Sequence, residues 1–238
     1  MTFMERRDRQ ENLQTGKDQP TVFYFVRHGT TEWNQKKRYQ GHADNPLDEM
    51  GERQGALLAE YFRDIPLDLA VTSPLKRAVQ TLEYALSTQP REVPVIFEPG
   101  VMEIDFGDAD GLVEGEIRER YPEFYRTYVM GLDRGHAQAP GGESVPDVYR
   151  RMRDSIMRVA REHPGKNVIV TSHGSAIQTF LNFAAGHPED QIDRIILVNV
   201  AVSCVAVDPD GTPHILYIGD KHHVPEELQF SYGPAPKA

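Results

Sequence analysis

The sequence of 238 residues contains a single cysteine, Cys204. One cysteine excludes an intrachain disulfide and any zinc site built from several cysteines. Cys204 lies within the apolar run 202–207. This position favours a buried, unreactive thiol over an exposed, reactive one.

The chain also lacks long hydrophobic runs and an excess of positive charge. No stretch is long enough to span a bilayer, and residues 1–20 contain no apolar segment like that of a secretory signal. The formal net charge is -10 and no basic stripe is visible, so neither nucleic acid nor membrane is an expected partner. The expected location is cytoplasmic. A local group of arginines can still attract an anion into one cleft.

Short apolar runs alternate with longer segments of helical periodicity, which is typical of layered α/β proteins. Several runs are apolar throughout, as in a mostly parallel central sheet with helices on both faces. A DPDG turn at 208–211 predicts that the last two strands form an antiparallel hairpin at a sheet edge. The expected strands are 21–27, 69–72, 93–97, 167–171, 202–207 and 214–218.

Four helices are expected between these strands, and one segment interrupts the alternation. Residues 111–142 are helical and tyrosine-rich at first and then contain glycines, and we interpret them as an insertion above the C-terminal strand ends. We expect residues 20–230 to form one domain, with a disordered head at 1–19 and a tail at 231–238. The helices are expected to run from the cap Asp48 to about Arg63, from about Pro74 to Ser87, from Ser144 to just before Pro164, and from about Ser175 to Ala185.

Three of the expected strands end in arginine or histidine. Arg27 ends the first strand and His28 follows it, while His173 follows the fourth strand; each histidine precedes a glycine. Arg77 lies in the first turn of the helix that follows the second strand. Ligands of open α/β sheets bind at the carboxyl ends of strands, and arginine matches phosphate oxygens. Because histidine can act as nucleophile or base, the set indicates a phosphoryl site.

The segment GVMEIDFGDADG supplies the carboxyl groups that such a site needs. Glu103 follows the apolar pair Val101-Met102. Partial burial there is expected to favour the protonated form that a general acid requires. The other acids fit a solvated, turn-rich loop: Asp105, Asp108 and Asp110.

Taken together, these segments resemble the histidine phosphatase superfamily, also called the phosphoglycerate mutase-like family. Each motif is weak by itself, whereas the ordered set is specific and covers roughly residues 21–220. Two positions depart from the family pattern. Asp110 stands where glutamate is frequent, which we interpret as a peripheral difference. Ser175 stands where glycine is frequent, and we prefer a helix N-cap role to a hydroxyl that reaches the pocket. The matching segments are RHGTTEWN, YQGHADNPLDEMGERQG, TSPLKRAVQT, EIDFGD, GGES and SHG.

The resemblance implies a role for each matching residue. His28 would attack phosphorus and form a phosphohistidine, and Glu103 would protonate the leaving oxygen and then activate water. Arg27, Arg77 and His173 would bind the equatorial oxygens, with His28 neutral and His173 protonated. No cofactor and no metal ion are implied. The remaining matches concern a phosphate hydrogen bond and the pocket mouth: Asn34, Gln40 and Gly41.

Three functions fit this interpretation. The preferred one is metal-independent, acid-type hydrolysis of a small phosphorylated metabolite. A cofactor-dependent phosphoglycerate mutase is the alternative, but mutases of the family carry a longer, more basic insertion with an ERHYG pattern. A phospho-ligand-binding module is disfavoured because every matching catalytic position is filled. Formation of a homodimer is left as an open alternative.

The substrate is also left open. Arg118 or Arg120 near the mouth would support a phosphatase of 3-phosphoglycerate type, and a cobalamin-pathway nucleotide phosphatase is a further alternative. The aromatic residues of the insertion are expected to pack it onto the sheet rather than contact substrate. His222 and His223 are not expected to bind metal, because neighbours on a strand point apart. The aromatic residues are Tyr121, Phe124, Tyr125 and Tyr128.

Overall fold

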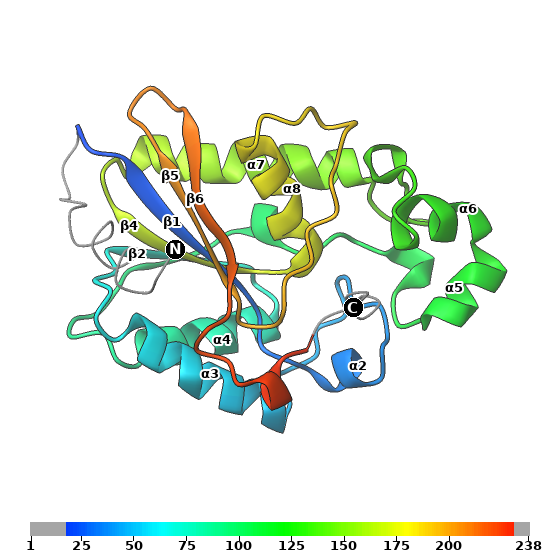
Figure 1. Cartoon of the computed structure of the whole chain (residues 1–238), viewed down its shortest axis with the longest axis horizontal. Coiled ribbons are helices and arrows are strands. Elements are labelled where there is room, and N and C mark those ends of the chain that lie inside the picture. The colour runs from blue at the N-terminus through cyan, green and yellow to red at the C-terminus, as the bar shows by residue number, and fades with distance from the viewer. Residues whose placement is uncertain (1–17, 231–238) are drawn as a thin grey trace.

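The computed structural model describes residues 18–230, in which a six-stranded sheet lies between two layers of helices (Figure 1). The predicted tail and nearly all of the predicted head lie outside the described residues. No helix of residues 18–230 is long and apolar enough to cross a membrane. The predicted three-layer α/β/α architecture is confirmed.

The strand order in the sheet is β3-β2-β4-β1-β5-β6. The first four strands along the chain are parallel, and β5 and β6 form the predicted antiparallel hairpin at one edge. The third strand begins two residues later than predicted, after Pro94, which has no amide hydrogen for a ladder. The bounds are β1 Thr21–Arg27, β2 Leu69–Thr72, β3 Val95–Phe97, β4 Asn167–Ser172, β5 Val202–Val207 and β6 Pro213–Asp220.

Two pairs of long helices cover the sheet (Figure 1). Helices α3 (Glu49–Phe62) and α4 (Lys76–Leu86) pack on one face. Helices α7 (Val145–Glu162) and α8 (Gly174–Ala184) pack on the other. Two of these helices begin where the sequence predicts, because the side chains of Asp48 and Ser144 accept hydrogen bonds from first-turn amides.

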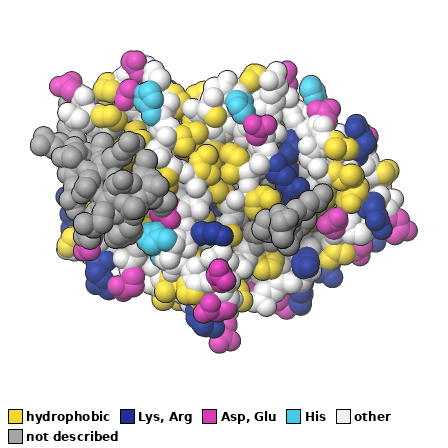
Figure 2. Space-filling view, in the orientation of Figure 1, with side chains coloured by type: hydrophobic (Ala, Val, Ile, Leu, Met, Phe, Trp, Pro, Cys, Tyr) yellow, Lys and Arg dark blue, Asp and Glu magenta, His cyan; other side chains and the backbone are white. Residues whose placement is uncertain are grey.

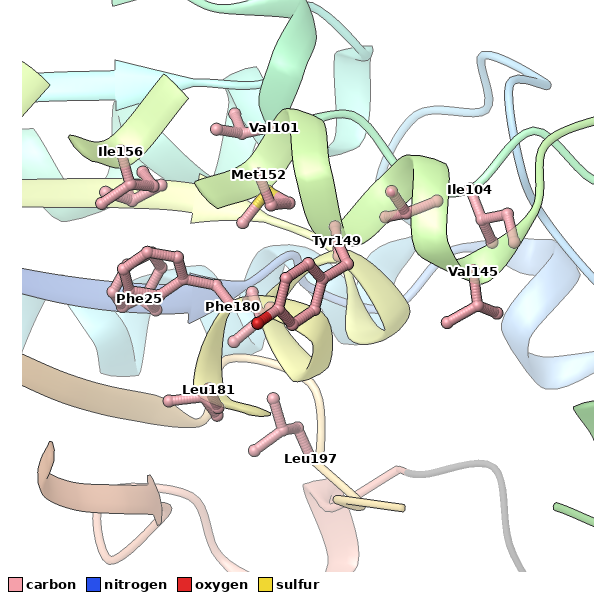
Figure 3. Close-up of a cluster of buried hydrophobic side chains, with 14 of the residues drawn as sticks. Phe25, Val101, Ile104, Val145, Tyr149, Met152, Ile156, Phe180, Leu181 and Leu197 are labelled. Carbon is pink, nitrogen blue, oxygen red and sulfur yellow. The ribbon is translucent and has the colours of Figure 1, made fainter. Parts of the chain in front are cut away.

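Side-chain alternation along β1 divides the hydrophobic core into two clusters. Phe23 and Phe25 face α7 and α8, whereas Val22, Tyr24 and Val26 face α3 and α4. Figure 3 shows the first cluster, in which the Phe25 and Phe180 ring centroids are 4.8 Å apart. The central strand is therefore buried on both faces, as its continuous apolar sequence predicts.

The single cysteine of the chain lies in this sheet. Cys204 of β5 is fully buried, and burial raises the pKa of its thiol. Both findings agree with the predicted unreactive thiol.

The insertion leaves the sheet between β3 and α7. Its helices α5 (Glu114–Arg120) and α6 (Pro122–Phe124) and the π-helical turn η3 (Tyr125–Val129) lie beyond the C-terminal strand ends (Figure 1). Tyr128 packs edge-on against Phe106, with ring centroids 5.5 Å apart, and stacks on Phe124. The predicted packing role is confirmed for these rings. The shorter helical turns are α2 Glu32–Gln35, η1 Pro99–Val101, η2 Gly107–Ala109, η4 Arg134–His136 and η5 Glu226–Leu228.

Candidate active site

The predicted site residues gather where β1, β2 and β4 end. β1 and β4 are adjacent parallel strands with Arg27 opposite Ser172, so His28 and His173 are the next residues along the two strands. Their ring centroids lie 5.1 Å apart. The order of strands in the sheet therefore brings together two histidines that are distant in the sequence.

His28 is buried in an environment that keeps its ring neutral. Its Nδ1 lies 2.7 Å from the carbonyl oxygen of Gly29. Because a carbonyl oxygen can only accept, Nδ1 carries the hydrogen and the lone pair of the neutral ring is on Nε2. Burial, followed by the charges of Arg77 and Arg27, holds the pKa of His28 well below its usual value. The ring is therefore a nucleophile near neutral pH.

Three contacts fix the position of the turn that carries His28. The amide of Gly29 donates to Oγ1 of Thr81 (2.9 Å), and Nδ2 of Asn199 donates to the carbonyl of His28 (2.6 Å). A Cβ atom on Gly29 would lie 2.9 Å from the carbonyl oxygen of Gly51, so the turn meets α3 too closely for a side chain. These contacts fix the histidine backbone relative to the sheet.

The two predicted arginines differ in how deeply they are buried. Arg27 is 6% exposed, lines the site cavity and donates from Nη1 to the carbonyl of Leu197. Arg77 is fully buried and does not line the cavity; Nη1 and Nη2 donate to the carbonyls of Ala43 and Gly41, 2.8 Å each. Burial lowers the pKa of Arg77 to about 10. It therefore stays cationic at neutral pH.

His173 is buried behind His28. Its Nε2 lies 2.8 Å from Oγ of Ser73, and its Nδ1 has no hydrogen-bond partner within residues 18–230. Burial, followed by Arg77 and His28, holds the pKa of His173 well below its usual value. These surroundings favour the neutral ring, whereas the family resemblance implies a protonated one. The negative charge of a phosphoryl group would supply the stabilisation that protonation requires.

The loop after β1 adds two amide groups to the cavity wall, Asn34 and Gln40. Oδ1 of Asn34 accepts from the amide of Thr31 (3.0 Å), and Oε1 of Gln40 accepts from Oγ1 of Thr31 (2.9 Å). Since these oxygens are occupied, the group that each side chain can present to an anion is its nitrogen. Nε2 of Gln40 is buried without a partner among the described residues. Gly41, predicted at the mouth, is not part of the wall.

Asp110, predicted to be peripheral, instead organises the neighbouring loop. Its two carboxylate oxygens accept from the amides of Gly41 and Ala43, 2.9 Å each. The carbonyls of the same two residues accept from Arg77. Asp110 therefore sets the position of the buried arginine through two backbone groups.

Glu103 is 7% exposed and lines the cavity. Oε1 accepts from the amides of Ile104 (2.9 Å) and Ala176 (3.1 Å), and Oε2 accepts from the amide of Ser175 (3.2 Å). Two of these donors belong to the first turn of α8, whose N-terminus carries partial positive charge. These hydrogen bonds fix the orientation of the Glu103 side chain at the cavity.

Arg151 of α7 holds the loop that carries Glu103. It donates to the carbonyls of Met102 (2.6 Å) and Glu103 (2.8 Å), and Nε donates to the carboxylate of Glu143 (2.8 Å). Glu143, from the GGES motif, also accepts from the amide of Asp105 (2.9 Å). Sequence reasoning missed Arg151, because nothing distinguishes it from the other arginines of an amphipathic helix.

One cavity, about 120 Å³ in volume, borders the catalytic candidates and extends toward the insertion. This is several times the space that one ordered water needs. Figure 2 shows basic side chains gathered on this face of the molecule, near the insertion. The part of the wall beyond Arg27, His28 and Glu103 includes Tyr128, Arg134, Ser175, Gln178, Arg194 and Ile195.

Three predictions about this wall need correction. His173 holds the N-cap position of α8, and the hydroxyl of Ser175 instead reaches the cavity and bonds to that of Tyr128. Tyr128 therefore lines the site as well as packing the insertion. Arg118 and Arg120 are exposed on α5 and do not line the cavity. Their side chains point away because the buried face of that short helix is formed by Ile117.

The paired histidines near the C-terminus follow β6 rather than lie on it. Nδ1 of His222 contacts the carboxylate of Asp220 (2.9 Å), and Nε2 of His223 donates to the carbonyl of Val200 (3.1 Å). Within the described part of the chain, no group of three or more histidine, cysteine, aspartate or glutamate side chains could hold a metal ion.

Comparison with known proteins gives a consistent set of relatives. The family model of the histidine phosphatase superfamily (branch 1) matches residues 23–221. The uncharacterised phosphatase PhoE of Bacillus subtilis (strain 168) is 35% identical over 184 residues, which are 77% of this chain and 86% of PhoE. Phosphoserine phosphatase 1 of Hydrogenobacter thermophilus is 39% identical over 150 residues, 63% of this chain and 69% of its own.

Two further relatives extend the comparison. The probable phosphoglycerate mutase GpmB of Cronobacter sakazakii is 32% identical over 182 residues, 76% of this chain and 83% of its own. The solved structure of YhfR from Bacillus stearothermophilus matches with a TM-score of 0.78 at 29% identity, covering 86% of this chain and all of YhfR.

Proposed function

This chain belongs to the histidine phosphatase superfamily, and from that premise we propose that it hydrolyses phosphomonoesters of small metabolites through a phosphohistidine at His28, without a metal ion. The observation that carries the proposal is the state of His28. Its ring is neutral, its Nδ1 hydrogen is engaged, and it lines a cavity that arginine also lines. A basic imidazole nitrogen beside fixed cations is what attack on a phosphate ester requires.

In the first step Nε2 of His28 donates its lone pair to phosphorus, and the bond from phosphorus to the ester oxygen breaks. Glu103, in its protonated form, gives its proton to the departing oxygen. The ring then carries positive charge, which the carbonyl of Gly29 stabilises by accepting from Nδ1. The products of this step are the free alcohol and a phosphorylated His28.

In the second step a water molecule attacks phosphorus and gives a proton to the carboxylate of Glu103. The bond between Nε2 and phosphorus breaks, which restores the lone pair on His28 and releases inorganic phosphate. Charge on the phosphoryl oxygens is stabilised in both steps by the cations and amide donors around the histidine. We assign that role to Arg27, Arg77, His173, Asn34 and Gln40.

The acid-type classification is also part of this proposal, and the surroundings of His28 support it. The lowered pKa of His28 keeps the nucleophile neutral in mildly acidic solution. The ring can therefore attack phosphorus on the acidic side of neutrality.

A phosphoglycerate mutase is the second candidate, and the relative named as a probable mutase favours keeping it. A mutase has to retain a phosphorylated intermediate and exclude water from it. Beyond Arg27, the only arginines on the described cavity wall are Arg134, which is buried, and Arg194, which is exposed. This modest charge favours the hydrolase. We further propose that residues 20–230 act as one domain; the homodimer and the cytoplasmic location stay predictions.

The decisive test measures phosphate release from a panel of phosphomonoesters in EDTA, while 2-phosphoglycerate formation from 3-phosphoglycerate is followed in parallel. Release that EDTA does not reduce is the expected result. Rapid isomerisation with little release would replace the hydrolase with the mutase. If no ester is hydrolysed or isomerised, the phospho-ligand-binding module becomes the preferred interpretation.

A further inference from the structure

Arg134 is a buried cation without a buried counterion. It is 8% exposed and forms no ion pair with a carboxylate of residues 18–230. Its contacts are neutral ones. Nη1 donates to the carbonyl of Tyr128 (2.9 Å), and the guanidinium lies over the ring of Tyr128, 4.3 Å from its centroid. Nε has no hydrogen-bond partner in the described part of the chain.

A charge in this position is costly unless an anion compensates it, because burial removes water from the guanidinium. Arg134 lines the same cavity as His28, so the compensating group can be supplied by a molecule in that cavity. A neutral hydroxyl group would satisfy a donor but would leave the charge uncompensated. Arg134 therefore favours a ligand with negative charge in addition to the phosphoryl group.

Gln178 provides a second, independent observation on the same wall. The side chain is 3% exposed, and Oε1 accepts from the amide of Ile195 (2.9 Å). This hydrogen bond orients the amide group and leaves Nε2 as a buried donor without a partner among residues 18–230. A polar residue buried in the apolar helix α8, at the cavity and with an unused donor, is typical of a binding group.

The rim of this part of the cavity adds positive charge. A Cβ atom on Gly131 would lie 3.8 Å from Cδ of both Arg134 and Arg194, so the two arginines flank one glycine. Arg194 is exposed, and it can attract an anion to the entrance without a large desolvation cost. Val129 and Ile195 lie on the same part of the wall, and the one carboxylate among the described residues that line the cavity is Glu103. Backbone amides of Ile104, Ser175 and Ala176 donate to that carboxylate.

We propose that Arg134 and Gln178 form a subsite for a carboxylate on the alcohol part of the substrate. The preferred substrates are then phosphomonoesters of small hydroxy acids. This inference rests on the proposed hydrolase and names its substrate class. Guanidinium and amide hydrogens can each donate to one carboxylate oxygen. A second phosphoryl group fits less well, since it would place up to about two negative charges beside Arg134, the one buried arginine of this part of the described wall.

The experiment compares esters that differ in the carboxylate. O-phosphoserine is paired with O-phosphoethanolamine, and 3-phosphoglycerate with glycerol 1-phosphate. The quantity measured is the ratio of kcat/KM for the ester with the carboxylate to kcat/KM for its partner without it. We expect the wild-type enzyme to prefer the acid in each pair. Arg134→Met should reduce the ratio by roughly 10- to 100-fold, as loss of a charge-assisted hydrogen bond does.

Two further variants test the subsite independently of Arg134→Met. Gln178→Glu keeps the acceptor for the amide of Ile195 and replaces the donor by a negative charge, so the ratio should fall even if Arg134→Met does not fold. Arg118→Met removes an exposed arginine of the same insertion and should leave the ratio at the wild-type value.

The outcomes separate this inference from the hydrolase proposal. Turnover of the esters without a preference for the acids, or an acid preference that survives both cavity variants, would overturn the carboxylate subsite alone. Faster turnover of glycerol 1,3-bisphosphate, which has no carboxylate, than of every carboxylate monoester would assign the subsite to a phosphoryl group instead. No phosphate release from any ester would overturn the hydrolase, and the subsite with it.

Discussion

The imidazole rings of His28 and His173 lie 5.1 Å apart, with 56° between their planes, at the ends of two adjacent parallel strands. Burial and the charge of Arg77 lower the pKa of both rings, and His28 lowers the pKa of His173 further. The pair is therefore neutral in the folded protein. One ring has a free nucleophilic nitrogen, while the other has a buried Nδ1 without a partner in the described residues.

Replacement of the proposed nucleophile should stop turnover. His28→Ala is expected to lower kcat by at least about 10³-fold, because it removes the imidazole nitrogen on which the covalent intermediate forms. The enzyme is mixed with an ester whose phosphoryl group carries ³²P and is then denatured without acid. The wild-type chain should retain the radioactive label, and the variant should carry none. Circular dichroism checks folding, and a folded variant that retains wild-type turnover would disprove the assignment.

The role of Glu103 predicts a dependence on the leaving group. Glu103→Gln should slow hydrolysis of an alkyl phosphate by about 10²- to 10⁴-fold but affect para-nitrophenyl phosphate much less, because nitrophenolate leaves without a proton. Equal losses for both esters would argue against a general acid at this position.

Arg151 is expected to act as a positioning residue for Glu103. Arg151→Met removes the hydrogen bonds to the carbonyls of Met102 and Glu103, so the carboxylate should lose its alignment. We expect kcat to fall roughly 10- to 100-fold for the alkyl phosphate and less for the nitrophenyl ester.

Two further variants test whether this effect is positional. Arg151→Lys should recover part of the rate, because lysine can still reach a carbonyl. Arg153→Met, at a partly exposed position of the same helix where the arginine pairs with Asp154, is the control and should behave as wild type. A loss of thermal stability with unchanged kcat for both esters would reduce Arg151 to a structural role.

The buried histidines also predict how stability depends on pH. The pKa values of His28 and His173 are lower in the folded protein than the usual 6.5. Below pH 6.5 the unfolded chain therefore binds protons that the folded protein does not, and the free energy of unfolding decreases as the pH falls. At pH 5.5 each histidine should lower it by about 1.4 kcal/mol relative to neutral pH.

Urea denaturation at pH 7.5 and 5.5 measures this difference. His173→Gln should remove about half of the contribution of the two histidines, because His28 is then the one member of the pair that still titrates. An identical pH dependence in wild type and His173→Gln would contradict the buried, neutral state of that ring.

The sequence by itself determined the strands, the helix starts and the main candidates at the strand ends. These signals are local: an apolar run marks a buried strand, Asp48 and Ser144 supply their own caps, and residues that follow parallel strands lie at one edge of the sheet. The strand order was not needed to place Arg27 and His28 at a ligand site. It was needed to bring His173 next to His28.

Only the tertiary structure decided which polar residues face the site from other elements. Arg151 and Arg118 both look like arginines of amphipathic helices, yet one holds the Glu103 loop and the other is exposed. Asp110 and Ser175 gained their contacts from segments distant in the sequence. A side chain's partner across a fold depends on how whole elements pack, and local periodicity contains no record of that packing.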